Sequence, residues 1–186
     1  FWNQFGSVLK EGPAEDFANR EKIAELLRFS TTETDSATQD QSLAQYVERM
    51  KEGQSAIYYI TGGDVEGLAR SPQLEGFRSR GIEVLMLSDP VDEFWVPMAG
   101  PFEEMPFKSA TQGGADFDDI KSENAETDAD ESDADATPQE DIDRLIAAMK
   151  LALGEDVKDV RVSVRLTESS VCLVADDGDM DMNLER

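Results

Sequence analysis

The sequence predicts a small α/β domain, in which helices cover a parallel sheet, followed by an incomplete α+β domain. Two apolar runs of strand length, residues 57–60 and 82–87, are separated by helical patterns, which is the order of a βαβ unit. A strongly acidic stretch then interrupts these patterns. We therefore expect a helical connector (1–41), a small α/β unit (42–112), an acidic flexible linker (113–137) and a truncated second domain (138–186).

The connector is expected to contain two helices. Residues 1–11 have the apolar spacing of a helix end, and Gly12-Pro13 is expected to stop that helix. Residues 19–29 predict a second amphipathic helix, and the Ser-, Thr- and Asp-rich residues 30–41 predict a loop. Because the first residue is Phe and a helical pattern is already under way there, we expect the chain to begin inside a longer protein.

Residues 42–62 predict a helix, a turn and a buried strand. Ser42 is a good N-cap, because its hydroxyl can accept a hydrogen bond from a backbone N–H of the first turn. Apolar side chains then recur every three or four positions as far as Met50, and Gly53 is expected to provide a left-handed C-terminal cap. Residues 57–60 are β-branched or aromatic, which is typical of a strand buried on both faces.

Three further elements complete the expected α/β unit. Residues 64–69 predict a short helix, and a second helix begins at Ser71-Pro72 and ends at Gly81. Residues 82–87 predict a central strand, and residues 92–98 predict a short helical or turn segment. Two strands joined through helices should pair in parallel.

The composition of the acidic linker predicts a mobile segment rather than a defined cation site. Residues 116–143 contain thirteen acidic residues and a single lysine, half of the net charge of −24 of the chain. Such a segment buries too little apolar surface to offset the entropy of ordering. A calcium site is the sharper alternative, but residues 128–135 contain no Gly, and position 12 of a loop that starts at Asp128 is not a Glu, so we do not expect one.

The second domain is expected to open with a helix and a β-hairpin. Residues 142–153 have an apolar side chain every three or four positions, and Gly154 ends the pattern. The valines of 157–164 predict a strand, and residues 171–174 predict its antiparallel partner. The pattern is cut off at Arg186, so we expect this domain to be incomplete as given.

The composition excludes several classes of protein. With 41 acidic and 17 basic residues, the chain repels phosphate backbones, and binding to nucleic acid through a basic patch is not expected. The simplest explanation of this acidity is that it keeps the protein soluble, or that the source organism lives in a salt-rich environment. No run of about 18 apolar residues predicts a membrane span, and no signal segment opens the chain. The single Cys172 suits a reducing cytoplasm.

Several stretches, taken in order, resemble the 90-kilodalton heat-shock family of ATP-dependent chaperones, including its bacterial branch. The stretches are residues 1–12, 15–20, 26–29, 42–62, 81–85, 89–93, 157–161 and 165–167. The resemblance implies the later part of the family's middle domain, an acidic spacer, and the start of its C-terminal dimerisation domain.

The resemblance implies a homodimeric, ATP-driven chaperone that binds unfolded or partly folded client proteins in the cytoplasm during stress, with possible co-chaperones. The family's site for ATP and magnesium lies upstream of Phe1, so no cofactor, catalytic residue or metal ligand is expected in this chain. The residues agree, since there is no His, no Gly-rich phosphate loop, and no Ser or Cys nucleophile beside a base. We therefore do not expect this chain to be an enzyme.

Two sets of reactive side chains have plainer interpretations. The arginines could bind phosphate, but ion pairs with acidic neighbours on the helix surface are favoured. The residues concerned are Arg20, Arg28 and Arg49, with Glu21, Glu25 and Glu48 as partners. Cys172 lies in a predicted apolar strand and is expected to be a buried small hydrophobe rather than a reactive thiol.

Client contact is the function that this chain is expected to carry, at Glu93, Phe94, Trp95 and Met98. Neighbours on a helix point about 100° apart, so Phe94 and Trp95 cannot both face one core and at least one should be exposed. Met98 would add an adaptable contact. In bacterial relatives an acid–aromatic pair at this place is linked to clients, which maps onto Glu93 with Phe94 or Trp95. The second aromatic and Pro97 depart from the family's usual pattern.

Three alternatives stay open. Trp95 could pack onto the strand at 82–87 as part of the core. The whole chain could be a structural spacer with client contacts elsewhere, in which case both aromatics would be buried. A linker modulated by calcium would require a thermal shift with added calcium, which we do not expect beyond charge screening.

Overall fold

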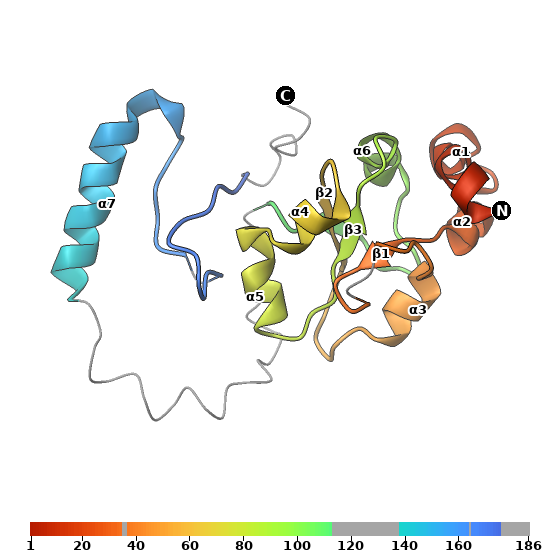
Figure 1. Ribbon diagram of the computed structural model, residues 1–186, viewed down its shortest axis with the longest axis horizontal. Coiled ribbons are helices and arrows are strands. Elements are labelled where there is room, and N and C mark those ends of the chain that lie inside the picture. The colour runs from red at the N-terminus through yellow and green to blue at the C-terminus, as the bar shows by residue number, and fades with distance from the viewer. Residues whose placement is uncertain (35–36, 113–137, 164, 176–186) are drawn as a thin grey trace.

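A four-stranded sheet forms the centre of the α/β unit in the computed structural model, which describes residues 1–34, 37–112, 138–163 and 165–175 (Figure 1). The strands, in the order β1-β3-β2-β4, are β1 (Ser30–Thr31), β3 (Leu85–Leu87), β2 (Ile57–Thr61) and β4 (Phe107–Ser109). β3 and β4 are parallel to β2, whereas β1 is antiparallel to β3. The predicted parallel pair is therefore confirmed. The sequence does not predict β1 and β4, because strands this short have no periodicity of their own.

The helices of the described residues begin and end close to the predicted positions in most cases. They are α1 (Trp2–Glu15), α2 (Arg20–Leu26), α3 (Leu43–Glu48), α4 (Val65–Ala69), α5 (Glu75–Arg78), α6 (Asp92–Trp95) and α7 (Gln139–Leu153). Short 3₁₀ turns are η1 (Pro72–Leu74), η2 (Val96–Met98) and η3 (Gly154–Asp156).

The connector differs from the prediction at two places. α1 continues through Gly12-Pro13 and ends at Glu15, and the N–H of the C-cap residue Asp16 donates to the carbonyl of Gly12. Gly12 is small because α2 packs there: a Cβ would lie 3.0 Å from Cδ1 of Ile23. α2 ends at Leu26, and the chain then extends through Phe29 into β1, so part of the predicted loop is a strand.

The predicted helix–turn–strand unit is confirmed, with a shorter helix. Ser42 and Gln45 form a reciprocal capping box, each side chain accepting a hydrogen bond from the other residue's backbone N–H. α3 ends at Glu48, and Gly53, expected as its cap, has a φ of +87° in the turn that follows instead.

Both faces of the sheet are covered, as the apolar character of the β2 strand predicts. One core packs α4 and α5 against the sheet through residues that include Tyr58, Leu68 and Phe77. The other packs α3, α6 and the connector against the opposite face, through residues that include Ile57, Tyr46 and Trp95. This second core fixes the position of α6.

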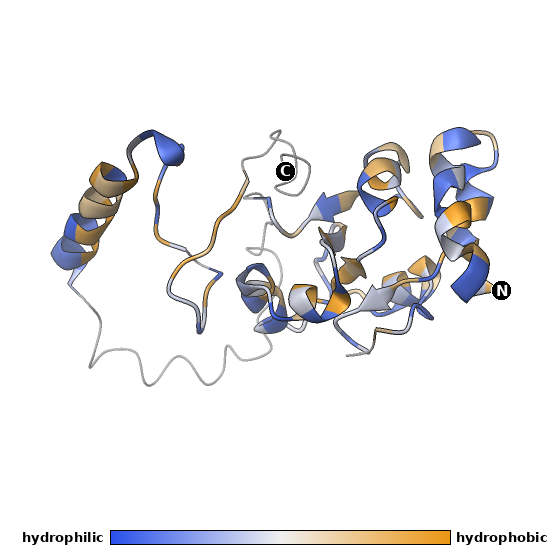
Figure 2. Cartoon of the chain, turned by 45° about the horizontal axis from the view of Figure 1, so that its top comes forward, coloured by the Kyte–Doolittle hydropathy of each residue, from blue (hydrophilic) through white to orange (hydrophobic). Residues whose placement is uncertain are grey.

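The part of the chain after the linker confirms a helix but not a hairpin. α7 is amphipathic, and Figure 2 shows hydrophobic and hydrophilic residues side by side along it, yet none of its residues is buried. Among the described residues of 157–175 there is no strand, only an isolated bridge between Gln112 and Ala175. Val171 and Leu173 stay exposed, and a hairpin with no covered face is marginal in water. Within the described ranges, no helix is long and apolar enough to cross a membrane.

Candidate functional site

The α6 helix separates the two neighbouring aromatic side chains. Trp95 is fully buried, whereas Phe94 is 64% exposed and Met98 is 44% exposed. Glu93 is partly exposed beside them. The expectation that at least one aromatic reaches solvent is confirmed for Phe94, and Trp95 takes the alternative position in the core.

Packing and one hydrogen bond hold Trp95 in place. Its ring stacks on Phe29 at 5.8 Å between centroids and meets Phe107 edge-on at 5.8 Å. Its indole N–H donates to Oδ1 of Asp92 over 2.7 Å, so its polar group is satisfied inside the core. Because Asp92 starts the same short helix, fixing Trp95 also fixes the outward direction of Phe94.

A buried ion cluster, formed by Lys10, Asp89 and Asp92, ties α1 to α6. The ammonium of Lys10 lies 2.7 Å from Oδ2 of Asp89 and 2.9 Å from Oδ1 of Asp92, and both Lys10 and Asp92 are at most 1% exposed. The same ammonium lies 5.2 Å from the centre of the Phe29 ring, within cation–π range. The amide of Gln39 adds a hydrogen bond of 2.9 Å to Asp89.

The two carboxylates of this cluster respond differently to burial. Burial raises the pKa of Asp92 above its ordinary value, against the opposing effects of Lys10 and the Trp95 N–H. Burial also opposes ionisation of the more exposed Asp89, but the hydrogen bond and charge of Lys10, together with the hydrogen bond of Gln39, outweigh it, so the pKa of Asp89 is lowered. The cluster therefore depends on Lys10 to keep Asp92 charged inside the protein.

An apolar groove, which we call the α1–α6 groove, opens beside Phe94. It has a volume of about 270 Å³ and is lined by Glu11, Ala14, Glu15, Val91, Phe94 and Trp95. Farther along α1, Phe1, Phe5 and Val8 are also exposed. The groove combines apolar walls with carboxylates, a surface suited to partners with apolar and basic side chains.

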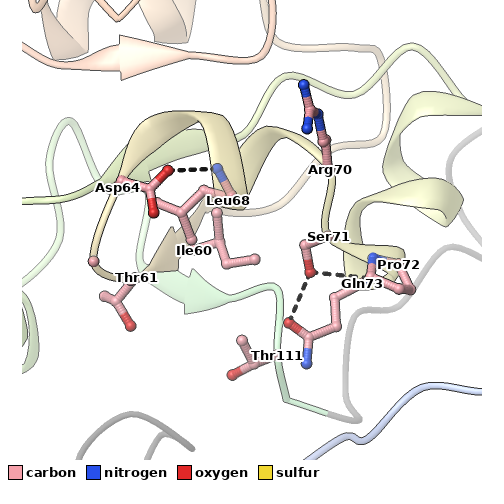
Figure 3. Close-up of a pocket in the computed structure, with 12 residues that line it drawn as sticks. Ile60, Thr61, Asp64, Leu68, Arg70, Ser71, Pro72, Gln73 and Thr111 are labelled. Carbon is pink, nitrogen blue, oxygen red and sulfur yellow. Dashed lines mark hydrogen bonds between the residues drawn. The ribbon is translucent and has the colours of Figure 1, made fainter.

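A second hollow lies at the carboxyl ends of β2 and β4. It has a volume of about 380 Å³, and its lining includes Thr61, Asp64, Gln73 and Thr111 (Figure 3). Its polar groups serve the fold: the Asp64 carboxylate accepts the N–H of Gly67, and the Ser71 hydroxyl accepts the N–H of Gln73. Nothing in its lining pairs a nucleophile with a base, so the geometry suggests no reaction.

Two of the three arginines, Arg49 and Arg28, have structural partners that differ from the predicted glutamate carboxylates. Arg49 forms a two-pronged ion pair with Glu83, at 2.9 and 2.8 Å, rather than with Glu48. Arg28 donates to backbone carbonyls of Glu25 and Leu27. Long-range ion pairing of this kind leaves no trace in helical spacing, which is why the sequence suggested the wrong partner.

Two further predictions concern the thiol of Cys172 and a metal site in the acidic linker. Cys172 is only partly buried and lies outside any strand, contrary to prediction, and burial raises the pKa of its thiol. Across the described ranges, no group of three or more Cys, Asp or Glu side chains could hold a metal ion. The linker at 113–137, with the calcium alternative, lies outside the described residues.

The ion cluster is the feature that sequence reasoning missed. Gly6, Lys10 and Pro13 are the buried residues of α1, spaced four and three apart. A lysine on the inner face of a helix therefore signalled a buried charge, but the sequence held no sign of partners 79 and 82 positions away.

Comparisons with known proteins agree with one another. The sequence profile described as "Hsp90 protein" matches residues 1–186. "Chaperone protein HtpG" of Roseobacter denitrificans is 55% identical over the whole chain, and its counterpart in Paramagnetospirillum magneticum is 53% identical. The chain spans 29% of the length of each. A structure described as the middle domain of a putative heat shock protein of Plasmodium falciparum aligns with a TM-score of 0.55 and 33% identity, covering 59% of this chain and 46% of that one.

Proposed function

The chain belongs to the Hsp90 protein family, and we propose that it is a region of an ATP-dependent molecular chaperone that binds unfolded or partly folded proteins. The whole protein would bind ATP and magnesium outside this chain, form a homodimer and act in the cytoplasm during stress. This region would provide client contact and the link to the dimerisation domain.

Client contact is assigned to Phe94, Met98 and Glu93 together with the α1–α6 groove. The observation that carries this assignment is the exposure of Phe94 on a helix that is otherwise anchored in the core. An exposed aromatic side chain on a rigid support loses little entropy when it binds, and such residues dominate protein interfaces. Trp95 has a supporting role, since it is buried behind Phe94.

The alternative, a structural spacer with client contacts elsewhere, requires both aromatics to be buried. Phe94 is exposed, so this observation favours client contact. The carboxylates at Glu11, Glu15 and Glu93 add a preference for clients with basic residues next to apolar ones.

The test measures binding of a fluorescently labelled, partly folded protein to the whole chaperone dimer by anisotropy. Changing Phe94→Ser together with Met98→Ser should weaken binding about tenfold, as expected when an interface loses a contact worth about 1.4 kcal/mol. Leu26→Ser, at a 56% exposed position on α2, is the matched control and should leave the affinity unchanged.

The substituted side chains are exposed, so the variants should have the same unfolding midpoint as the original protein. Unfolding curves check this before the affinities are compared. Equal affinity of the double variant and the original protein would refute the assignment, as would an equal loss for Leu26→Ser. A substitution of Trp95 would not serve, because its removal from the core costs about 3–5 kcal/mol of stability.

A further inference from the structure

A segment that follows α7, residues 165–175, lies against α5 and the end of β4, and we call it the strap. It is held by polar contacts to residues of the α/β unit that are far away in the sequence.

The guanidinium of Arg165 anchors the first end of the strap. Arg165 is 5% exposed and donates to the carbonyl of Ala110 over 3.1 Å and to the carbonyl of Gln112 over 2.7 Å. These carbonyls lie just past the carboxyl end of β4. The planar fork of an arginine can reach both at once, which the single ammonium of a lysine cannot do with the same geometry.

The carboxylate of Glu75 binds the next turn of the strap through its backbone. It accepts the N–H groups of Thr167, Glu168 and Ser169 at 2.7, 2.9 and 3.2 Å, and also the hydroxyl of Ser169. The hydrogen bonds from Glu168, Ser169 and Thr167 lower the pKa of Glu75 to about 2. Hydrogen bonds of this charge-assisted kind are the stronger ones in proteins.

Two further contacts hold the far end of the strap. The Gln73 side-chain amide donates to the carbonyl of Leu173 over 2.8 Å, and the Ala175 N–H donates to the carbonyl of Thr111 over 2.9 Å. Gln73 and Thr111 also line the hollow in Figure 3. The strap therefore runs along the rim of that hollow.

Close approach of the strap to α5 depends on a glycine. A Cβ at Gly76 would lie 3.0 Å from Cα and 3.1 Å from the carbonyl oxygen of Arg165. Gly76 does not have a positive φ. Its lack of a side chain thus serves the contact, since an alanine would be favoured inside a helix by up to about 1 kcal/mol.

The contacts show what kind of partner this surface fits. Apart from those of Arg165 and the Ser169 hydroxyl, the strap hydrogen bonds described above involve its backbone, while Val171 and Leu173 are exposed at 61% and 67%. We propose that Gln73, Glu75, Gly76 and the carbonyls of Ala110 to Gln112 form a docking site for an arginine-bearing polypeptide segment, and that residues 165–175 are its resident ligand.

The chemistry supports an exchangeable contact. Recognition of backbone groups and one arginine leaves the other side chains free to vary, so another polypeptide of the same chemistry can bind when the strap leaves. The strong negative charge of the chain favours a cationic partner. Docking of the strap also fastens the residues that follow α7 to the α/β unit.

The test adds a labelled synthetic peptide of residues 165–175, with Cys172→Ser, to the 186-residue chain and measures anisotropy. The intact chain should bind it weakly, because its own strap competes at a high effective concentration. The Arg165→Lys chain should bind it at least tenfold more tightly. Adding Glu75→Gln to the Arg165→Lys chain should abolish this gain in affinity. Adding Glu66→Gln instead, at an exposed carboxylate on α4, should preserve it.

A peptide that itself carries Arg165→Lys should bind at least tenfold more weakly. Equal binding of the two peptides, equal binding with and without Glu75→Gln, or no binding to any chain would overturn the proposal. Hydrogen exchange provides the second measurement: Gly76→Ala should keep α5 folded but lose protection of the amides of 167–169. Unchanged protection in that variant would also overturn it.

Discussion

Replacing Lys10 by Met should destabilise the α/β unit by about 3 kcal/mol at neutral pH. The substitution keeps the length and apolar part of the side chain but removes the only cation within 3 Å of Asp92 in the described cluster. Asp92 is fully buried, and breaking a buried ion pair from one side costs about 3–5 kcal/mol. The lower end of this range applies for two reasons. Asp89 is partly exposed, and the N–H groups of Trp95 and Asp89 still bind Asp92.

The pH dependence of this loss distinguishes a stranded charge from lost packing. Burial already raises the pKa of Asp92, and removal of Lys10 raises it further. The loss of unfolding free energy caused by Lys10→Met therefore reaches its full value above the pKa of Asp92 in the folded state. It shrinks by up to about 1.4 kcal/mol per pH unit as the pH falls from there towards the unfolded-state value near 4, because the carboxyl takes up a proton.

Urea unfolding, followed by circular dichroism between pH 4.5 and 8, measures this prediction. Combining Lys10→Met with Asp92→Asn should recover at least half of the loss, since no charge is then stranded. The control, Lys22→Met at an exposed position on α2, should change stability by less than about 0.5 kcal/mol. A loss below 1 kcal/mol, or a loss that does not change with pH, would refute the reasoning.

Two other predictions concern single hydrogen-bonding groups. The Tyr46 hydroxyl donates to the carbonyl of Glu83 and accepts from the backbone of Tyr58, so Tyr46→Phe should cost about 1–3 kcal/mol in urea unfolding; an unchanged midpoint would show that these groups find other partners. The pKa of Glu75 is lowered from 4.5 to about 2, so its support of the strap is complete above pH 4.5 and disappears as the pH falls to 2. The chemical shift of the Ser169 amide should change with the titration of the Glu75 carboxylate near pH 2. A midpoint near pH 4.5 would contradict the prediction.

Much of the fold could be predicted because its signals are local. The apolar runs at β2 and β3, the helical residues between them and the Ser42 cap each depend on a few neighbouring positions. The short strands β1 and β4 escaped prediction because they exist only by pairing with β3 and β2. The hairpin predicted after residue 157 is absent among the described residues, since nothing there covers its apolar side chains.

The candidate sites were less predictable for the same reason. The strap brings together residues about 90 positions apart, and the ion cluster joins residues about 80 apart. Neither pairing appears in any local pattern. Gly76 and Lys10 were the available signs, a glycine inside a helix and a lysine on an inner face, but neither identifies its partner.

The sequence by itself determined that the chain is an α/β unit followed by an acidic linker, and that two adjacent aromatics must point in different directions. Only the tertiary structure decided which one is buried. Trp95 went inward because Phe29, Phe107 and the carboxylate of Asp92 surround it, and Lys10 allows that carboxylate to be buried. Phe94 is left at the surface, because burial depends on partners that only the folded chain brings together.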